Sequence, residues 1–413
     1  MKNSKNNIYT VDFLMSFIAV FGVVMFLPML PHIQQVFGVS VSQISWIPNV
    51  GYLTMIIFSS FVGKIINKVG IKRLLLFSLI LWIMGISIEI LALNNLYFNV
   101  FITGRVIEGI GEAFIFPLLL SMNKVGLRNK GNEKVGLSLI EFGAALGGLI
   151  AAIIAGQFIN NPKQFLIIPI SIAVLAGLFI FIRLKLVVLK ELEDKEQDKG
   201  IKEGKKTFIS LLLMIFMIQT IFASIQVYLA YYMEAFSLPN LTGAVISIEQ
   251  IIVALGTITP IFFFKRVSFK SFRNIIVLVF VFGTTILGMQ VSIYISVVAL
   301  SIIAFFVGAS FTYLNIYLSK IIKTKAAQKL SLYTSIRYTG GFVLSFSWGK
   351  LIENYRGNLQ GYAEIFRRLY IFEGIMVVGI FLVVIFLQGD LVSIFKPKSR
   401  KTTLMDEVEH LNT

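Results

Sequence analysis

The sequence contains no cysteine and only two histidines, His32 and His410. The lack of cysteine excludes disulfide bonds, thiolate metal sites and cysteine nucleophiles. Two histidines leave little material for an imidazole-based site, and neither the His-Glu-x-x-His metal motif nor the Gly-x-Ser-x-Gly nucleophile elbow occurs. We therefore expect a protein that is not an enzyme and that carries neither a metal nor an organic cofactor.

Charged residues are also scarce, at 14% of the chain against roughly 25% in an average soluble domain, whereas 57% of the residues are hydrophobic. A helix needs about 20 apolar residues to cross a bilayer. The runs are too long and too uniformly apolar for barrel strands, so helices are expected. The sequence predicts an all-α integral membrane protein with twelve transmembrane helices, at 8–30, 44–63, 74–93, 98–122, 135–158, 165–186, 208–233, 241–264, 274–290, 297–319, 330–351 and 366–388.

The net charge of +16 could suggest nucleic-acid binding, but its distribution indicates membrane topology instead. Of the 37 Lys and Arg residues, 30 lie at the chain ends and in alternate connections, five lie in the other connections, and Arg105 and Arg337 lie within spans. Positive flanks stay on the cytoplasmic side during insertion. We predict a multi-pass plasma-membrane protein with both termini cytoplasmic and no nucleic-acid partner. Four of the five contrary charges precede the last span: Lys350, Arg356, Arg367 and Arg368.

A highly charged connection divides the chain into two parts of similar length. We predict an N-terminal six-helix half at 1–186, a cytoplasmic linker at 187–207, a C-terminal six-helix half at 208–388 and a cytoplasmic tail at 389–413. The connections after the second and the eighth span each carry four basic residues, which supports a repeat. Two parallel repeats place a binding site between them, near the middle of the membrane.

Three ionisable residues share one face of the fourth span. Arg105, Glu108 and Glu112 stand at i, i+3 and i+7, within a sector of roughly 60°. Charge is costly in lipid, so this face must point to the protein interior or to a water-filled cavity. One interpretation is an intrahelical Arg105–Glu108 pair that only fixes packing. The other is a proton or cation relay in which Glu112 titrates, Glu108 is an alternate and Arg105 modulates the protonation state.

The fifth span has a stripe of small residues, which favours close helix packing in lipid. Glu141, near the cytoplasmic end of that span, is a further alternate for the titrating role. Arg337 in the eleventh span lies at nearly the same depth, but we expect Glu141 and Arg337 to have separate partners rather than a direct salt bridge. The residues assigned to helix packing are Gly143, Gly147, Gly148, Ala152 and Gly156.

Uncharged polar residues in the seventh and tenth spans are candidates for a substrate cavity. Amides and phenols can orient an amphipathic ligand without fixing its charge. Hydrogen bonding between helices alone is the competing interpretation. Glu249 in the eighth span is a further buried acid. The candidate cavity residues are Gln219, Gln226, Tyr313, Asn315 and Tyr317.

The connection between the second and third spans resembles the loop motif of the major facilitator superfamily. Asn67 stands where that family usually has Asp, and an amide can accept a hydrogen bond but cannot supply the charge. The resemblance implies a gating role for this loop. The residues that match or replace the motif are Gly63, Asn67, Lys68, Gly70, Lys72 and Arg73.

Two further segments resemble motifs of the same family. The segment from Gly104 to Pro117 is similar to a motif of proton-coupled drug exporters whose Arg is associated with coupling, with Glu108 in place of Gln. The segment 143–148 resembles the antiporter motif, with Ala144 in place of its Pro.

The resemblance extends over nearly the whole chain and implies the major facilitator fold, with two six-helix halves that rock about a central site. It implies proton-coupled antiport, that is efflux, of small amphipathic compounds. The expected partners are a small-molecule substrate, a coupling ion (H⁺) and the lipid bilayer, for a monomeric protein. Proton-coupled uptake of a small polar metabolite and lipid translocation are the open alternatives. A sensor or scaffold is disfavoured, because the sequence predicts no large domain outside the membrane.

Overall fold

The computed structural model describes residues 2–126, 133–158, 162–184, 205–238, 241–322, 325–355 and 359–388. Within these ranges every regular element is a helix and no strand occurs. The elements are α1 (Lys2–Val24), η1 (Leu27–Met29), α2 (Leu30–Phe37), α3 (Val41–Ile44), α4 (Trp46–Val69), α5 (Ile71–Asn95), α6 (Phe98–Gly126), α7 (Glu133–Gln157), α8 (Pro162–Arg183), α9 (Lys205–Ala235), α10 (Thr242–Phe263), α11 (Phe269–Met289), α12 (Ile293–Ile321), α13 (Ala326–Tyr355) and α14 (Leu359–Gln388).

Eleven helical segments in the described part of the chain are long and apolar enough to cross a membrane. The expectation of an all-α membrane protein is confirmed. The twelfth predicted span, 330–351, is the 30-residue helix α13, which is too polar to be counted by its composition. It packs between α4 and α9, and the polar side chains that are buried there include Thr334, Arg337 and Ser345. The first span differs from a single straight helix because Pro28 and Pro31 begin η1 and α2 in place of a continued α1.

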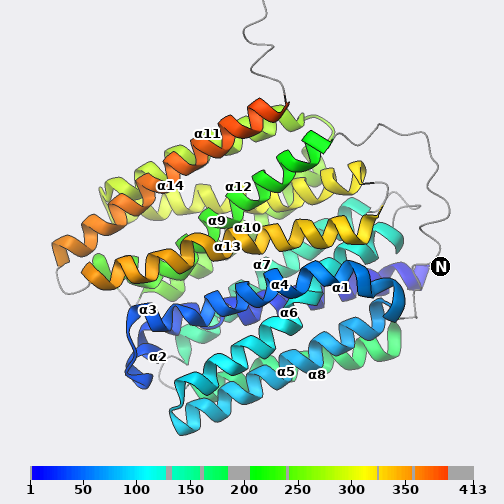
Figure 1. The fold of residues 1–413 in the computed structure, drawn as a ribbon, viewed down its shortest axis with the longest axis horizontal. Helices are drawn as coiled ribbons and strands as arrows, with labels where there is room; N and C mark the ends of the chain where they lie inside the picture. The colour runs from blue at the N-terminus through cyan, green and yellow to red at the C-terminus, as the bar shows by residue number, and fades with distance from the viewer. Residues whose placement is uncertain are drawn as a thin grey trace, which may run out of the picture.

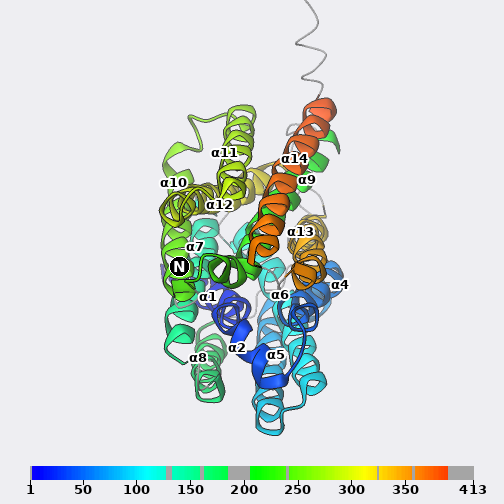
Figure 2. The ribbon, with the colours of Figure 1, turned by 90° about the vertical axis from the view of Figure 1, so that its left-hand side faces the viewer.

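The helices run side by side in two groups (Figure 1). The first group, α1 to α8, lies below the second group, α9 to α14, and the two views agree in this arrangement (Figures 1 and 2). The groups meet where α4 packs on α13 and where α7 packs on α10. The predicted boundary at 187–207 and the predicted tail at 389–413 lie mostly or wholly outside the described residues. We call the end of the bundle where α1 begins and α12 ends, at the right in Figure 1, the terminal end.

Two of the basic residues that do not fit the predicted topology, Arg367 and Arg368, form salt bridges with an acidic residue. At the start of α14, Glu364 lies 3.4 Å from the Nη1 atom of Arg367 and 3.0 Å from the Nε atom of Arg368. These side chains are exposed, so each pair contributes little to stability. The local net charge is nevertheless smaller than the count of basic residues suggests. Arg356 lies outside the described residues.

The small residues of α7 serve two interfaces. A Cβ atom on Gly143 would come within 2.6 Å of the Phe13 carbonyl oxygen, and one on Gly147 would overlap the backbone of α1 at Phe17. On another face, a Cβ atom on Gly148 would lie 2.7 Å from the Gln250 side chain of α10. Ala152 and Gly156 border Gly243 of α10 on the same side. Helix α7 therefore approaches its own group and the other group closely.

We expect Gly147→Ala to destabilise the protein, because the new methyl group must displace the α1 backbone. The same substitution at Gly156 is the matched control, since a Cβ atom there would meet nothing within 4 Å, and Ala is favoured over Gly in a helix by about 1 kcal/mol. The measurement is the apparent melting temperature of the detergent-solubilised protein. Equal melting temperatures for the two variants would contradict the close contact between α7 and α1.

Candidate functional site

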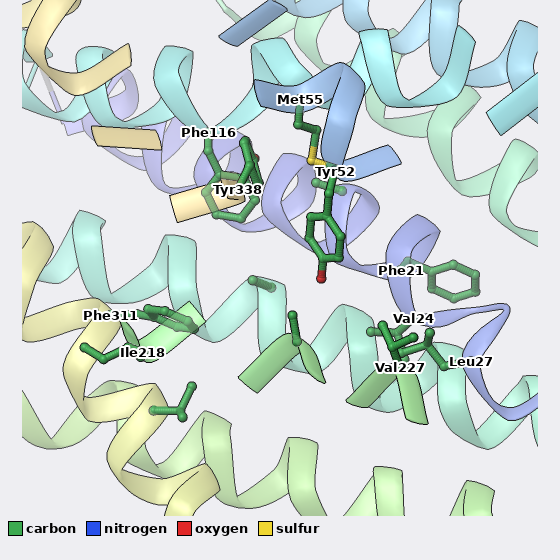
Figure 3. Close-up of a cluster of buried hydrophobic side chains, with 14 of the residues drawn as sticks. Phe21, Val24, Leu27, Tyr52, Met55, Phe116, Ile218, Val227, Phe311 and Tyr338 are labelled. Carbon is green, nitrogen blue, oxygen red and sulfur yellow. The ribbon is translucent and has the colours of Figure 1, made fainter. Parts of the chain in front are cut away.

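A cavity lies between the two helix groups, with about 490 Å³ of space not filled by atoms when its open side is included. Its walls are mainly apolar and aromatic side chains from α1, α4, α6, α9 and α13. In Figure 3 the phenol group of Tyr52 points into the space between the helices, and Phe116 and Tyr338 border the same cavity. The charged and amide side chains that reach this cavity are Glu112, Gln219, Gln226 and Arg337. A concave, mostly apolar space with a few convergent polar groups is typical of a small-molecule site.

The predicted charged face of α6 lies in the protein interior, where Arg105 is 1% exposed. Its guanidinium group forms a salt bridge with Glu108 and lies 3.9 Å from the Oε1 atom of Glu89 in α5. The Nε atom of Arg105 donates a hydrogen bond to the Ile47 carbonyl oxygen at 3.1 Å. The intrahelical pair is therefore present, within a larger network that fixes Arg105 between α4, α5 and α6.

Glu89 is the member of this network that the sequence did not assign to a site. It is 0% exposed, and its carboxylate oxygens have no hydrogen-bond partner among the described residues. Helices α5 and α6 come close at Gly85 and Gly104, where a Cβ atom on either glycine would collide with the other helix. The sequence did offer a signal for this site, because Glu89 is an acidic residue within a predicted span and lies four residues after Gly85.

Glu112 lies one helical turn beyond Glu108 in α6 and borders the cavity. The Trp82 indole donates a hydrogen bond to its Oε1 atom at 3.3 Å, and its Oε2 atom has no hydrogen-bond partner among the described residues. Gly22 of α1 leaves room for the acids, since a Cβ atom there would lie 2.5 Å from Glu112 Oε1 and 2.6 Å from Glu108 Oε1. Glu112 therefore combines burial, an unpaired oxygen and contact with the cavity.

Arg337 and Glu141 form a direct salt bridge, so the expectation of separate partners was wrong. Two guanidinium nitrogens of Arg337 bind the two carboxylate oxygens of Glu141, at 2.8 Å and 3.1 Å. Gln219 accepts a third hydrogen bond from Arg337 at 3.1 Å, and Asn315 donates one to Glu141 at 2.8 Å. Arg337 also lies 3.8 Å from the ring centre of Phe311. The long Arg337 side chain reaches Glu141 of α7 from α13, next to Gln219 of α9 and Phe311 of α12. A bidentate pair satisfies both buried charges.

The other candidate cavity residues are divided by the structure. Gln219 and Gln226 line the cavity, whereas Asn315 lies behind Glu141. Tyr313 and Tyr317 lie away from the cavity, near the connection between α10 and α11. The Tyr313 phenol donates to the Val267 carbonyl oxygen at 3.0 Å, and Tyr317 stacks on Phe269 with ring centres 4.8 Å apart. Glu249 is buried in α10 outside the cavity lining, and its Oε2 atom has no hydrogen-bond partner among the described residues.

The loop motif after α4 connects several helices. Gly63 lies against the α13 backbone, because a Cβ atom there would come within 2.6 Å of the Ala327 carbonyl oxygen. Gly70 has a φ of 87°, which permits the sharp turn between α4 and α5. Lys72 donates to the Phe181 carbonyl oxygen at 2.7 Å, at the end of α8. The remaining motif residues, Asn67, Lys68 and Arg73, are exposed.

Lys124 joins the two helix groups at the terminal end. Its ammonium group reaches from α6 to the C-terminus of α12, where it binds the Ser319 carbonyl oxygen and the Ile322 carbonyl oxygen, the latter at 2.8 Å. The neighbouring Asn123 donates to Asp12 of α1 at 2.7 Å. A cation near the last carbonyl groups of a helix is favourable. These contacts therefore hold α6 against α12 on the terminal side of the cavity.

We expect Lys124→Gln to expose the cavity toward the terminal end, because it removes the ammonium group that caps α12. The chain has no native cysteine, so a single cysteine at Ala19, which lines the cavity, reports access directly. A membrane-impermeant thiol reagent added to the terminal side should label Ala19→Cys faster in Lys124→Gln than in the parent. Lys205→Gln is the control, since Lys205 is an exposed lysine at the start of α9. An unchanged labelling rate would contradict the closing role of Lys124.

Comparison with known proteins gives the family. Residues 13–345 match the family model of the Major Facilitator Superfamily. An MFS-type transporter of Gibberella moniliformis is 23% identical over 233 residues, 55% of each chain. Multidrug resistance protein 2 of Bacillus subtilis is 23% identical over 182 residues, 43% of this chain and 44% of that protein. The matches thus span about half the length of these relatives.

Solved structures show the same fold. The human organic anion transporter MFSD10 (TETRAN) is similar with a TM-score of 0.71 at 14% identity, covering 92% of this chain and 99% of that chain. The proton:xylose symporter XylE gives a TM-score of 0.73 at 16% identity, covering 92% and 95%. At sequence identities this low, the similarity shows a shared fold and does not show a shared function. Together with the family match over most of the sequence, they show that this chain belongs to the Major Facilitator Superfamily, a family of membrane transporters and not of enzymes.

Proposed function

We propose that the protein exports small amphipathic compounds across the plasma membrane in exchange for protons, as a monomer with both termini in the cytoplasm. The observation that carries the proposal is the position of Glu112 at the edge of the cavity, where its buried carboxyl group has one oxygen without a hydrogen-bond partner among the described residues. Acidic residues inside membrane-spanning helices are typical members of proton pathways in transporters. The resemblance of 104–117 to a drug-exporter motif and the match to a relative named as a multidrug resistance protein agree with it.

Exchange of protons for substrate requires one carboxyl group that can bind either a proton or the substrate, but not both at the same time. In the ionised form, Glu112 attracts the positive end of an amphipathic compound, and the apolar wall around Phe116 and Tyr338 holds the remainder. Protonation removes that attraction and releases the compound. Arg105 lies behind Glu112 and modulates the balance through the shared network, with Glu108 and Glu141 as alternates for the titrating group. The two halves then rock about the cavity to expose it to each side in turn.

The test is substrate-triggered proton movement in liposomes. The purified protein is reconstituted with a pH-sensitive dye in the lumen and an imposed pH gradient, and a panel of lipophilic cations is added. We expect a change in lumenal pH that needs both substrate and protein, is abolished by a protonophore and persists when Na⁺ is replaced by K⁺. Silence across the panel, with folding confirmed by size-exclusion chromatography, would overturn the proposal. A response that requires Na⁺ would show that the coupling ion is Na⁺ and not H⁺.

A second candidate function is proton-coupled uptake of a small polar metabolite. It is favoured by Gln219, Gln226 and Arg337, which bring hydrogen-bonding groups to the same cavity as Glu112. Uptake of radiolabelled sugars and organic acids into the same liposomes distinguishes the two functions. Saturable, gradient-driven accumulation of one of these compounds would support uptake over export.

A further inference from the structure

Three lysines from different segments gather around one aromatic ring at the terminal end. The Nζ atom of Lys320, near the end of α12, lies 4.0 Å from the ring centre of Phe264, and that of Lys134, at the start of α7, lies 5.2 Å from it. Lys265 follows Phe264 directly in the chain and lies close enough to repel the Lys320 ammonium, as Lys134 does. We call these four residues the Phe264 site.

The positive charge of the Phe264 site exceeds the negative charge that acts on it among the described residues. Glu133 is the acid that acts on Lys320 electrostatically, against the two neighbouring lysines. Within the part of the chain that the structure describes, none of the three lysines forms a salt bridge. Like charges repel more strongly beside a low-dielectric interior than in water. An anion at the Phe264 site would offset that repulsion.

The base of the Phe264 site consists of packed aromatic rings, and exposed apolar residues adjoin it in the chain. The Phe264 ring packs on Tyr313 with ring centres 4.9 Å apart, and Tyr313 stacks on Phe272 at 3.8 Å. Directly before Phe264 in the chain, at the end of α10, Phe262 is 70% exposed and Phe263 is 52% exposed. A free phosphate ion would use only the lysines, whereas a phospholipid would use both the lysines and this apolar surface. The arrangement therefore favours a lipid.

We propose that the Phe264 site binds the phosphate headgroup of an anionic phospholipid, whose acyl chains lie along Phe262 and Phe263. The terminal end is the predicted cytoplasmic face, where anionic lipids concentrate and basic pockets between helices take up their headgroups. The lysines come from α7 of the first group, and from α12 and the connection after α10 of the second group. A bound headgroup thus bridges the two groups beside the Lys124 contact and stabilises the arrangement in which the terminal end is closed.

The test compares the purified full-length chain in detergent with added phosphatidylglycerol or phosphatidylcholine. We expect phosphatidylglycerol to raise the apparent melting temperature more than phosphatidylcholine, and native mass spectrometry to show retained phosphatidylglycerol. The variant with Lys134→Gln, Lys265→Gln and Lys320→Gln should lose both effects. The matched control carries Lys64→Gln, Lys205→Gln and Lys206→Gln, which removes three exposed charges at the same end and should keep both effects.

Each outcome decides the proposal. Equal loss in the two triple variants would mean that overall charge attracts the lipid, and would overturn the Phe264 site. Equal stabilisation by glycerol 3-phosphate or inorganic phosphate would overturn the lipid as the ligand. If the triple variant does not fold, the single Lys320→Gln variant is compared with Lys64→Gln by the amount of retained phosphatidylglycerol, and equal retention overturns the proposal. None of these measurements depends on proton coupling or on transport.

Discussion

Glu112→Gln is expected to reduce proton-coupled transport to the level of empty liposomes while the protein still folds. The amide oxygen of Gln can accept the hydrogen bond from Trp82 that Glu112 accepts at 3.3 Å, so the local packing is kept. The amide cannot ionise, and it resembles the protonated carboxyl group. A lipophilic cation should therefore bind more weakly, and its addition should release no proton.

The measurement is lumenal pH during substrate addition, together with binding of the same cation to the detergent-solubilised protein. Glu364→Gln is the matched control, because Glu364 is an exposed acid that pairs only with Arg367 and Arg368 among the described residues. Near-normal coupled transport in Glu112→Gln would remove Glu112 from the titrating role. Glu108→Gln and Glu141→Gln would then be compared in the same assay.

The largest expected loss of stability follows from Arg337→Gln. This change leaves the Glu141 carboxylate buried without the guanidinium group that binds both of its oxygens. Removing one partner of a buried salt bridge costs about 3–5 kcal/mol. The apparent melting temperature should therefore fall strongly, and the yield of folded protein with it.

The double variant Arg337→Gln with Glu141→Gln tests the cause. Without the buried carboxylate, the unpaired charge is gone, and most of the lost stability should return. Glu141→Gln alone leaves Arg337 with Gln219 and the Phe311 ring, so its effect should be intermediate. If the double variant is as unstable as Arg337→Gln alone, lost packing of the Arg337 side chain is the cause and not the unpaired charge.

The helices were predictable from the sequence because lipid demands long apolar segments with internal hydrogen bonds. Their ends were less so: α1 was predicted to continue to residue 30, but Pro28 and Pro31 divide it into shorter helices. The buried face of Arg105, Glu108 and Glu112 was also predictable, because helical periodicity alone fixes which residues share a side.

Contacts between distant helices were not predictable in the same way. Glu141 and Arg337 are 196 residues apart, and their pairing depends on how α7 and α13 are placed by other contacts. The sequence indicated that Tyr313 and Tyr317 share one face of their helix. It did not indicate that this face packs on Phe272 and Phe269 and does not line the cavity. Periodicity gives the direction of a side chain around its own helix, and the partner on the other side comes only with the fold.

The polarity of α13 has a consequence for the assembly of the protein during synthesis. A helix that carries Arg337 and too few apolar residues to pass as a span by its composition gains little from entering lipid by itself. Its binding surfaces, α4 and α9, are both made earlier along the chain. We therefore expect α13 to leave the translocon only when these helices are already in place to receive it, which makes its insertion a checkpoint for the correct folding of everything synthesised before it.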